Sequence, residues 1–391
     1  MTSSSSHLYW RSRLAGCTVS ALTLISVAML GCSKGQLTPT DESSSLAAEP
    51  GSPTPAVSAI APLIVTDAVA TDSDDPAIWL DPDDPAKSLV LGTDKGGSIY
   101  VFDLDGKIIP EKTVSGMARM NNVDVEYGML LGGELTDIAV ATDRDANLVR
   151  AFRLPAMTPI DNGGIPVFAT EPPERQRPMG VALYKRPADG TFFAIFTRKA
   201  GPSGSYLWQY KLEDDGTGAL KMSKIREFGT FSGTGEIEAV AVDDELGYVY
   251  YSDEGAGIHK YHADPEAPGA DEELSIFGNT GFREDREGIS IYQIDGGTGY
   301  ILVSDQQANE YRIFAREGMP GDPHNHRFIK SVKVSANDSD GSEVTNVALN
   351  ADFPAGLFMA MSDDRTFHFY RWEDIAGDDL AIAPNGVPTT N

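Results

Sequence analysis

Short runs of apolar and aromatic residues recur along most of the chain, and each run is bounded by Gly, Asp, Asn or Pro. Runs of this length and composition, separated by turn-forming residues, predict β-strands. No long stretch has the 3.6-residue periodicity of an amphipathic helix, so alternating strands and helices are not expected. The clearest predicted strands are Ser88–Gly92, Gly97–Leu104, Thr136–Thr142, Phe192–Thr197, Tyr206–Leu212, Glu238–Val242, Tyr248–Ser252, Gly257–Tyr261, Gly288–Ile294, Tyr300–Ser304 and Tyr311–Arg316.

Two stretches, Glu238–Asp264 and Glu287–Glu317, align with each other as an internal repeat. In that alignment Glu238 matches Glu287, and each begins an apolar strand. A repeat of about fifty residues with three or four strands is typical of a propeller blade, and the strand-rich body has room for about six blades. The sequence therefore predicts an all-β fold, a six-bladed β-propeller. A β-sandwich or a β-helix would explain the repeat length less well.

Acidic residues gather in short clusters between the predicted strands. The densest cluster, Asp72–Asp75, has three carboxylates in four residues and leads directly into an apolar segment. Carboxylates crowded in this way repel one another unless a cation lies between them, and Ca²⁺ takes six to eight oxygen ligands. Because equivalent loops of propeller blades converge on one channel, Glu238 and Glu287 are expected to share a cavity. The other clusters are Glu236–Glu238, Asp253–Glu254, Glu284–Glu287 and Asp338–Glu343.

The beginning of the chain has a different composition from the rest. Arg11 and Arg13 precede an apolar stretch without charges, and this order predicts a signal peptide over residues 1–31. The stretch ends in Ala28-Met29-Leu30-Gly31-Cys32, which resembles a bacterial lipoprotein cleavage box with Cys32 as the lipidated residue. The alternative is an ordinary secretory signal with an incidental cysteine.

Two further segments are expected after the signal peptide. Residues 32–62 are rich in Ser, Thr, Pro and Ala and predict a flexible linker, and residues 63–385 predict the propeller domain. Both cysteines, Cys17 and Cys32, precede the domain, so no disulfide is expected within it. We expect an exported monomer that is an outer-membrane lipoprotein or a periplasmic or extracellular protein.

The charge of the chain restricts the partners that it can bind. The formal net charge is −27, and loss of Arg11 and Arg13 with the leader would make the remaining chain still more negative. Such a surface repels nucleic acid, so no nucleic-acid partner is expected. It would also repel an anionic substrate unless bound cations reversed the local field.

A series of segments, taken in chain order, carries a resemblance to one family. The most specific are Asp74-Asp75-Pro76-Ala77-Ile78-Trp79 and Asn121-Asn122-Val123-Asp124-Val125. The weaker ones are Asp137–Arg144, Asp285–Gly288, Gly299–Leu302, Phe353–Phe358 and Arg371–Ile375. Together they resemble the β-propeller phytases, also called alkaline phytases, over nearly all of Val69–Ala376.

This resemblance implies a function. It implies a six-bladed propeller that holds several Ca²⁺ ions and acts as a 3-phytase-like phosphomonoesterase. The substrate would be phytate (inositol hexakisphosphate) or another inositol polyphosphate, and the implied reaction is attack by a calcium-bound water without a covalent phosphoenzyme. Calcium would also reverse the field of the bare carboxylates, so a dense polyanion could bind there.

The resemblance also implies roles for individual residues. The implied calcium ligands are Asp74, Asp75, Glu238, Glu254, Asp285, Glu287, Gln306, Asp340 and Glu343. The implied catalytic residues are Lys95, Arg144 and Lys199, which would contact phosphate, together with Glu238 and Asp285. A third set would bind a structural ion or cap a turn, and it comprises Asn121, Asn122 and Asp124.

Two positions depart from the family pattern and keep other functions open. Met179 stands where the family has a tyrosine, and Ala200 replaces an acidic residue beside Lys199. One alternative is another propeller hydrolase of the lactonase type, which would need a single deep metal and few basic residues. The other is a catalytically silent propeller that binds a ligand or a partner.

Overall fold

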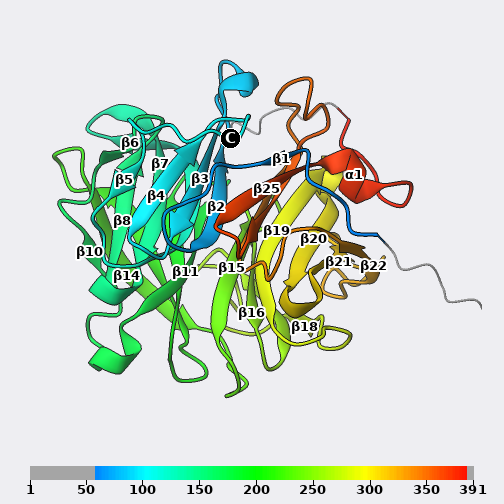
Figure 1. Ribbon diagram of the computed structural model, residues 1–391. Coiled ribbons are helices and arrows are strands. Elements are labelled where there is room, and N and C mark those ends of the chain that lie inside the picture. Colours follow the sequence, from blue (N-terminus) through cyan, green and yellow to red (C-terminus); the bar gives the residue numbers. More distant parts are fainter. Residues whose placement is uncertain (1–57, 385–391) are drawn as a thin grey trace, which may run out of the picture. The chain divides into compact units, whose positions relative to one another are not determined.

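The computed structural model describes residues 58–384, which form six antiparallel sheets around one axis (Figure 1). The first strand of each sheet contacts the first strands of both neighbouring sheets, so the inner strands close a ring. The predicted six-bladed β-propeller is therefore confirmed. The six inner strands are β2 (Ser73–Trp79), β6 (Met120–Leu131), β11 (Pro178–Lys185), β15 (Ile237–Asp243), β19 (Arg286–Ile294) and β23 (Ser342–Thr345).

Within each blade the strands follow one another outward from the channel. The second strands are β3 (Leu89–Asp94), β7 (Glu134–Asp143), β12 (Phe192–Arg198), β16 (Tyr248–Asp253), β20 (Thr298–Asp305) and β24 (Leu357–Ser362). The third strands are β4 (Ser98–Phe102), β8 (Leu148–Arg153), β13 (Leu207–Asp214), β17 (Gly257–His262), β21 (Glu310–Ala315) and β25 (Thr366–Arg371). The outer strands are β5 (Val114–Ser115), β10 (Ile165–Pro166), β14 (Leu220–Phe228), β18 (Ser275–Phe277), β22 (Phe328–Lys333) and β1 (Ile64–Val65), and a short β9 (Thr158–Pro159) also pairs with β8.

The last blade is built from both ends of the described chain. Its outer strand is β1, which pairs antiparallel with β25 so that Ile64 lies opposite Phe369. Just before β1, Ile60 forms a bridge to Val334 in the neighbouring blade. Because these hydrogen bonds join the start of the domain to its end, the ring cannot open without breaking sheet pairing.

Helical segments among residues 58–384 are single turns. The only α-helix there, α1 (Trp372–Ala376), follows β25. The 3₁₀ turns are Pro85–Lys87, Arg144–Ala146, Pro173–Arg175, Asp295–Gly297 and Gln306–Ala308. Within these same residues, no helix combines the length and the apolar character that crossing a bilayer would require.

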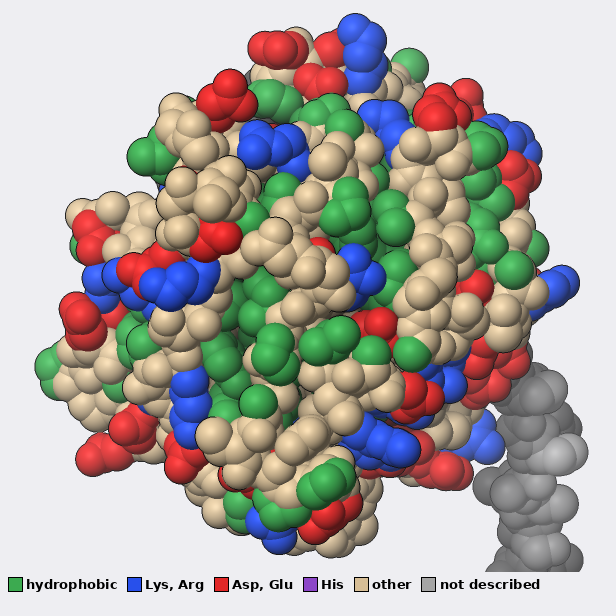
Figure 2. Space-filling model, turned by 90° about the vertical axis from the view of Figure 1, so that its left-hand side faces the viewer, with side chains coloured by type: hydrophobic (Ala, Val, Ile, Leu, Met, Phe, Trp, Pro, Cys, Tyr) green, Lys and Arg blue, Asp and Glu red, His purple; other side chains and the backbone are tan. Residues whose placement is uncertain are grey.

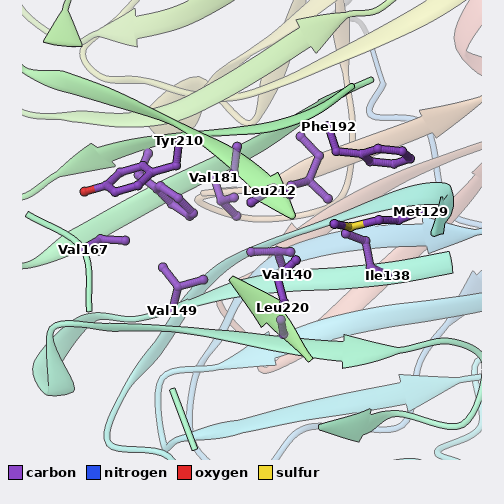
Figure 3. Packing of buried hydrophobic residues seen from close by; sticks show 14 of the residues in the cluster. Met129, Ile138, Val140, Val149, Val167, Val181, Phe192, Tyr210, Leu212 and Leu220 are labelled. Carbon is purple, nitrogen blue, oxygen red and sulfur yellow. The ribbon is translucent and has the colours of Figure 1, made fainter. Parts of the chain in front are cut away.

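The hydrophobic core lies between blades. In the interface of Figure 3, Val140 and Met129 from the second blade face Val181, Leu212 and other apolar side chains of the third blade. Each such side chain contributes about 1.5–3 kcal/mol when it is fully buried. Since apolar contacts hold neighbouring blades together, the ends of the inner strands are free to carry polar groups. On the face in Figure 2, acidic and basic side chains are interspersed without a patch of one sign.

The strand predictions hold within one or two residues at each end. For example, the strand predicted over Gly97–Leu104 is Ser98–Phe102. Glu238 and Glu287 are the second residues of β15 and β19, so the alignment of the two repeats is confirmed. The predicted signal peptide, Cys32 and most of the predicted linker lie outside the described residues.

Candidate functional site

Five of the six inner strands begin with an irregularity at the same place. In five blades the pairing with the second strand changes register after the first residue of the inner strand, which is the pattern of a β-bulge. Regular pairing resumes three residues later; in the last blade it begins at Ser342. We define the ring position as the residue two places before regular pairing. Its members are Asp74, Asn121, Met179, Glu238, Glu287 and Asp340.

Two more positions repeat beside the ring position. We call the residue directly after the second strand of a blade the rim position, and the residue two places before the ring position the flank position. The backbone N–H of the rim residue donates a hydrogen bond to the carbonyl of the flank residue. In the first blade, Lys95 donates to Asp72 at 2.8 Å. The rim residues are Lys95, Arg144, Lys199, Glu254 and Gln306. The flank residues are Asp72, Arg119, Arg177, Glu236 and Asp285.

Most residues that the sequence predicted for the site fall on these positions. Asp75 follows the ring position, and Glu343 lies in β23. Asn122 and Asp124 lie in β6 just after the ring residue Asn121. The other predicted residues occupy the ring, the rim or the flank, and basic and acidic residues at the rim and the flank come from different blades. The cations of the rim and flank come from the first three blades, and the acids come mainly from the fourth and fifth. This end of the channel therefore has a basic side and an acidic side.

Lys95 lies among three carboxylates. Its Nζ is 2.8 Å from Asp340 Oδ2, 3.4 Å from Asp74 Oδ1 and 3.6 Å from Asp72 Oδ2. Burial alone would lower the pKa of Lys95, but the attraction of Asp74, Asp340 and Asp72 outweighs burial and raises it. Lys95 is therefore an internal counter-ion of two predicted calcium ligands, a contact that the sequence did not indicate.

The carboxylates of the ring are poorly neutralised. Burial raises the pKa of Asp74 to about 7, against the attraction of Lys95 and with added repulsion from Asp340. Burial raises the pKa of Glu238 and of Glu287 as well; Asp74 and Asp340 add repulsion on Glu238, and Glu238 and Asp340 add it on Glu287. Such a group needs protons or a cation, because like charges held away from water disfavour ionisation.

Side-chain amides satisfy some of these oxygens. Asn121 Nδ2 donates to Glu238 Oε1, and Gln306 Nε2 donates to Asp340 Oδ1. Other oxygens remain without a partner although they are buried, and a buried polar atom without a hydrogen bond is costly. These unpartnered oxygens are Asp74 Oδ2, Asn121 Oδ1, Asn122 Oδ1 and Glu287 Oε2.

The donor set suits calcium, although the side chains are not arranged around an ion. Within residues 58–384, no three Asp, Glu, His or Cys side chains converge tightly enough to hold a metal. The available donors are carboxylate and amide oxygens, which are the ligands that hard cations take, and several of them lack a partner. The residues therefore fit calcium, and its binding stays a prediction.

The other two predicted phosphate-binding cations have different surroundings. Lys199 Nζ forms an ion pair with Glu236, which is the flank residue of the next blade. Arg144 has weaker contacts: its Nη1 is 3.3 Å from Met179 Sδ, its Nε is 3.8 Å from Asp145 Oδ1, and that Nε has no hydrogen-bond partner. Of the three cations, Arg144 is the least neutralised by the protein itself.

A second acidic group lies further along the channel. Asp75, Asp124 and Glu343 line a cavity of about 220 Å³. Burial raises the pKa of Asp124 to about 6 and that of Glu343 to about 8, the latter with added repulsion from Asp124. Burial also raises the pKa of Asp75, which accepts a hydrogen bond from Val123 N at 3.1 Å. Asp75 and Glu343 thus belong to this cavity rather than to the ring.

Sequence reasoning missed two cations of the flank position, Arg119 and Arg177. A spacing rule would have found them. The acidic clusters place an acid two residues before the ring residue, as in Glu236-x-Glu238, and Arg119-x-Asn121 and Arg177-x-Met179 repeat that spacing. This spacing was not recognised because the flank position holds an acid in some blades and an arginine in others.

Comparisons with known proteins agree with this architecture. A family model described as Phytase matches residues 27–376. The 3-phytase of Bacillus subtilis (strain 168) is 30% identical over 331 residues, which cover 80% of this chain and 83% of that protein.

The matches to solved structures are weaker. The WD40 β-propeller domain of Doa1 is 12% identical with a TM-score of 0.44, over 75% of this chain and 77% of that one. The BBS1N chain solved in complex with ARL6DN is 10% identical with a TM-score of 0.43, over 72% of this chain and 74% of that one. The Phytase model matches residues 27–376 and the Bacillus relative is 30% identical over 80% of the chain, which therefore belongs to the β-propeller phytase family and is a 3-phytase-like hydrolase.

Proposed function

We propose that this protein is a calcium-dependent phosphomonoester hydrolase that releases phosphate from phytate or other inositol polyphosphates. One observation carries the proposal: a basic side and an acidic side face each other at one end of the channel. The basic side can bind phosphate directly. The acidic side would repel phosphate by itself, so it can serve a polyanionic substrate only with bound cations.

The acidic side and the cavity provide oxygen ligands for several calcium ions. When bound, calcium would neutralise the carboxylates, attract phosphate oxygens and make a coordinated water more acidic. The family relationship and the unpartnered buried oxygens support this assignment. The residues that would hold calcium are Asp74, Asp75, Glu238, Glu254, Asp285, Glu287, Gln306, Asp340 and Glu343.

The protein's own groups would position the substrate. Arg144 and Lys199 come from the second and third blades and would bind phosphate oxygens, while Lys95 limits the charge of the ring. Glu238 is a buried carboxyl group beside Asp74 and Asp340, and burial with their repulsion raises its pKa, as is common for groups that take part in catalysis. Asp285 is fixed on the acidic side, since its Oδ2 accepts a hydrogen bond from Gln307 Nε2 at 2.6 Å.

The test is phosphate release from phytate in calcium and in excess chelator. We expect release that depends on calcium and returns when calcium is added back. An aryl monophosphate is the comparison substrate, because it lacks the neighbouring phosphates that the basic side would bind. Activity that survives chelation would refute the calcium assignment, and equal efficiency on both substrates would identify a general phosphatase.

We further propose that the mature protein is exported and attached to the outer membrane through lipid on Cys32. This proposal rests on the sequence alone. It is tested by labelling cells with a fatty-acid analogue and comparing the wild type with Cys32→Ala. The wild type should carry the label and fractionate with membranes, and the variant should lose both properties.

A further inference from the structure

Arg119 is a cation without a partner in a strongly acidic protein. The chain has 58 acidic residues and a net charge of −27, and the buried or half-buried arginines Arg150, Arg186, Arg198 and Arg316 each pair with a carboxylate. Within residues 58–384, in contrast, the Arg119 guanidinium makes no ion pair and no hydrogen bond, and its Nε is buried. Burying part of a charged group without a partner costs free energy, so such a group calls for a ligand.

The backbone around Arg119 is held in place. The buried Asp143 carboxylate accepts hydrogen bonds from Ala118 N at 3.1 Å and from Arg119 N at 2.9 Å. The Arg119 carbonyl in turn accepts the N–H of Arg144 at 2.8 Å. Two arginines from one blade are therefore fixed next to each other, and neither Nε has a hydrogen-bond partner.

The position of Arg119 in the blade places it at the candidate site. It is the flank residue of the second blade, equivalent to Asp72 in the first blade and to Asp285 in the fifth. Its charge reaches the ring: burial raises the pKa of the Asp74 carboxyl, and the positive charge of Arg119 offsets a small part of that rise. Arg119 therefore lies on the basic side of the channel end, within electrostatic reach of the predicted calcium ligands.

We propose that Arg119 and Arg144 together bind one phosphate group of an inositol polyphosphate. Guanidinium groups suit this task because their fixed N–H donors match phosphate oxygens in pairs. Lys95 and Lys199 serve this phosphate less well, because carboxylates already neutralise them. The inference rests on the proposed function and adds to it a subsite made by one blade.

The test compares Arg119→Gln and Arg119→Lys with the control Arg175→Gln. Arg175 is exposed and has no ion pair among the described residues, so its replacement removes the same charge without touching the subsite. Inositol hexasulfate, which is not hydrolysed as a phosphate ester, serves as the probe in titration calorimetry. Steady-state kinetics on phytate and on an aryl monophosphate supply the second readout.

We expect Arg119→Gln to weaken hexasulfate binding about tenfold and to raise KM for phytate by a similar factor, because the variant loses charge-assisted hydrogen bonds to that group. KM for the aryl monophosphate and the melting temperature should stay near the wild-type values, and Arg119→Lys should keep part of the affinity. Losses in Arg175→Gln equal to those in Arg119→Gln would overturn the proposal in favour of general electrostatics. Unchanged hexasulfate affinity in Arg119→Gln would also overturn it, whether or not phytate is hydrolysed.

Discussion

Replacing Glu287 with glutamine should stabilise the fold without calcium and reduce the stabilisation that calcium supplies. Glu287 is 7% exposed, its Oε2 has no hydrogen-bond partner, and burial with repulsion from Glu238 and Asp340 raises its pKa. Without calcium, the folded protein must keep this charge beside like charges or take up a proton. In the unfolded chain this carboxylate is exposed to water, so near neutral pH it stays ionised without that repulsion and without a proton. The Glu287 carboxylate therefore destabilises the folded state near neutral pH when calcium is absent.

The size of this effect follows from the burial. Leaving a buried polar group unsatisfied costs about 1–3 kcal/mol, and Glu287→Gln should recover a stabilisation of that order in excess chelator. A domain of this size should then melt a few degrees higher. Calcium at about a hundred times its Kd would stabilise the wild type by about 2.7 kcal/mol. The variant lacks one ligand charge and should gain much less from calcium.

Thermal unfolding of both proteins in chelator and in excess calcium measures the two effects. The control is Glu317→Gln, because Glu317 is exposed and only accepts a hydrogen bond from Gly299 N at 3.3 Å. This control should follow the wild type in both conditions and in phosphate release, whereas Glu287→Gln should lose most activity. If Glu287→Gln melts below the wild type in chelator yet gains as much from calcium, the ring is not a calcium site.

Gly180→Ala should lower stability by about 1–3 kcal/mol and reduce activity, because a Cβ at this bulge would overlap the carbonyl oxygen of Glu238 and displace that ring residue. Chemical denaturation measures the loss of stability, and phosphate release measures the loss of activity. A variant as stable and active as the wild type would contradict the close packing. A pH effect is expected at His326, whose Nε2 is 3.1 Å from the buried Lys260 Nζ, because burial lowers the pKa of His326 from 6.5 to about 4. The unfolded chain takes up this proton first, so the stability that neutral His326 contributes is present above pH 6.5 and is lost as the pH falls toward about 4. The difference in melting temperature between the wild type and His326→Gln should therefore shrink between about pH 7 and pH 5, and a constant difference would refute the assignment.

The fold could be predicted from the sequence because its determinants are local. Apolar runs bounded by Gly and Asp define the strands, and the repeat that matches Glu238 with Glu287 defines the blade. The repeat is visible in the sequence because each blade packs against a similar blade on either side and therefore needs a similar pattern of apolar residues. The acidic clusters also indicated the end of the channel where the candidate site lies. The role of individual residues in calcium and phosphate binding came from family resemblance, and the structure leaves it as a prediction.

The tertiary structure alone decided how charges meet across the ring. Asp340 is 245 residues from Lys95 in the chain, yet the two side chains form an ion pair because the inner strand of the last blade packs against that of the first. The flank residue Arg119 looks like any surface arginine in the sequence, and only the bulge register places it beside Arg144. Strand patterns depend on neighbours a few residues away, whereas these contacts depend on ring closure and register. The pKa of a group such as Glu287 depends on both, because burial and the neighbouring charges exist only once all six blades have assembled.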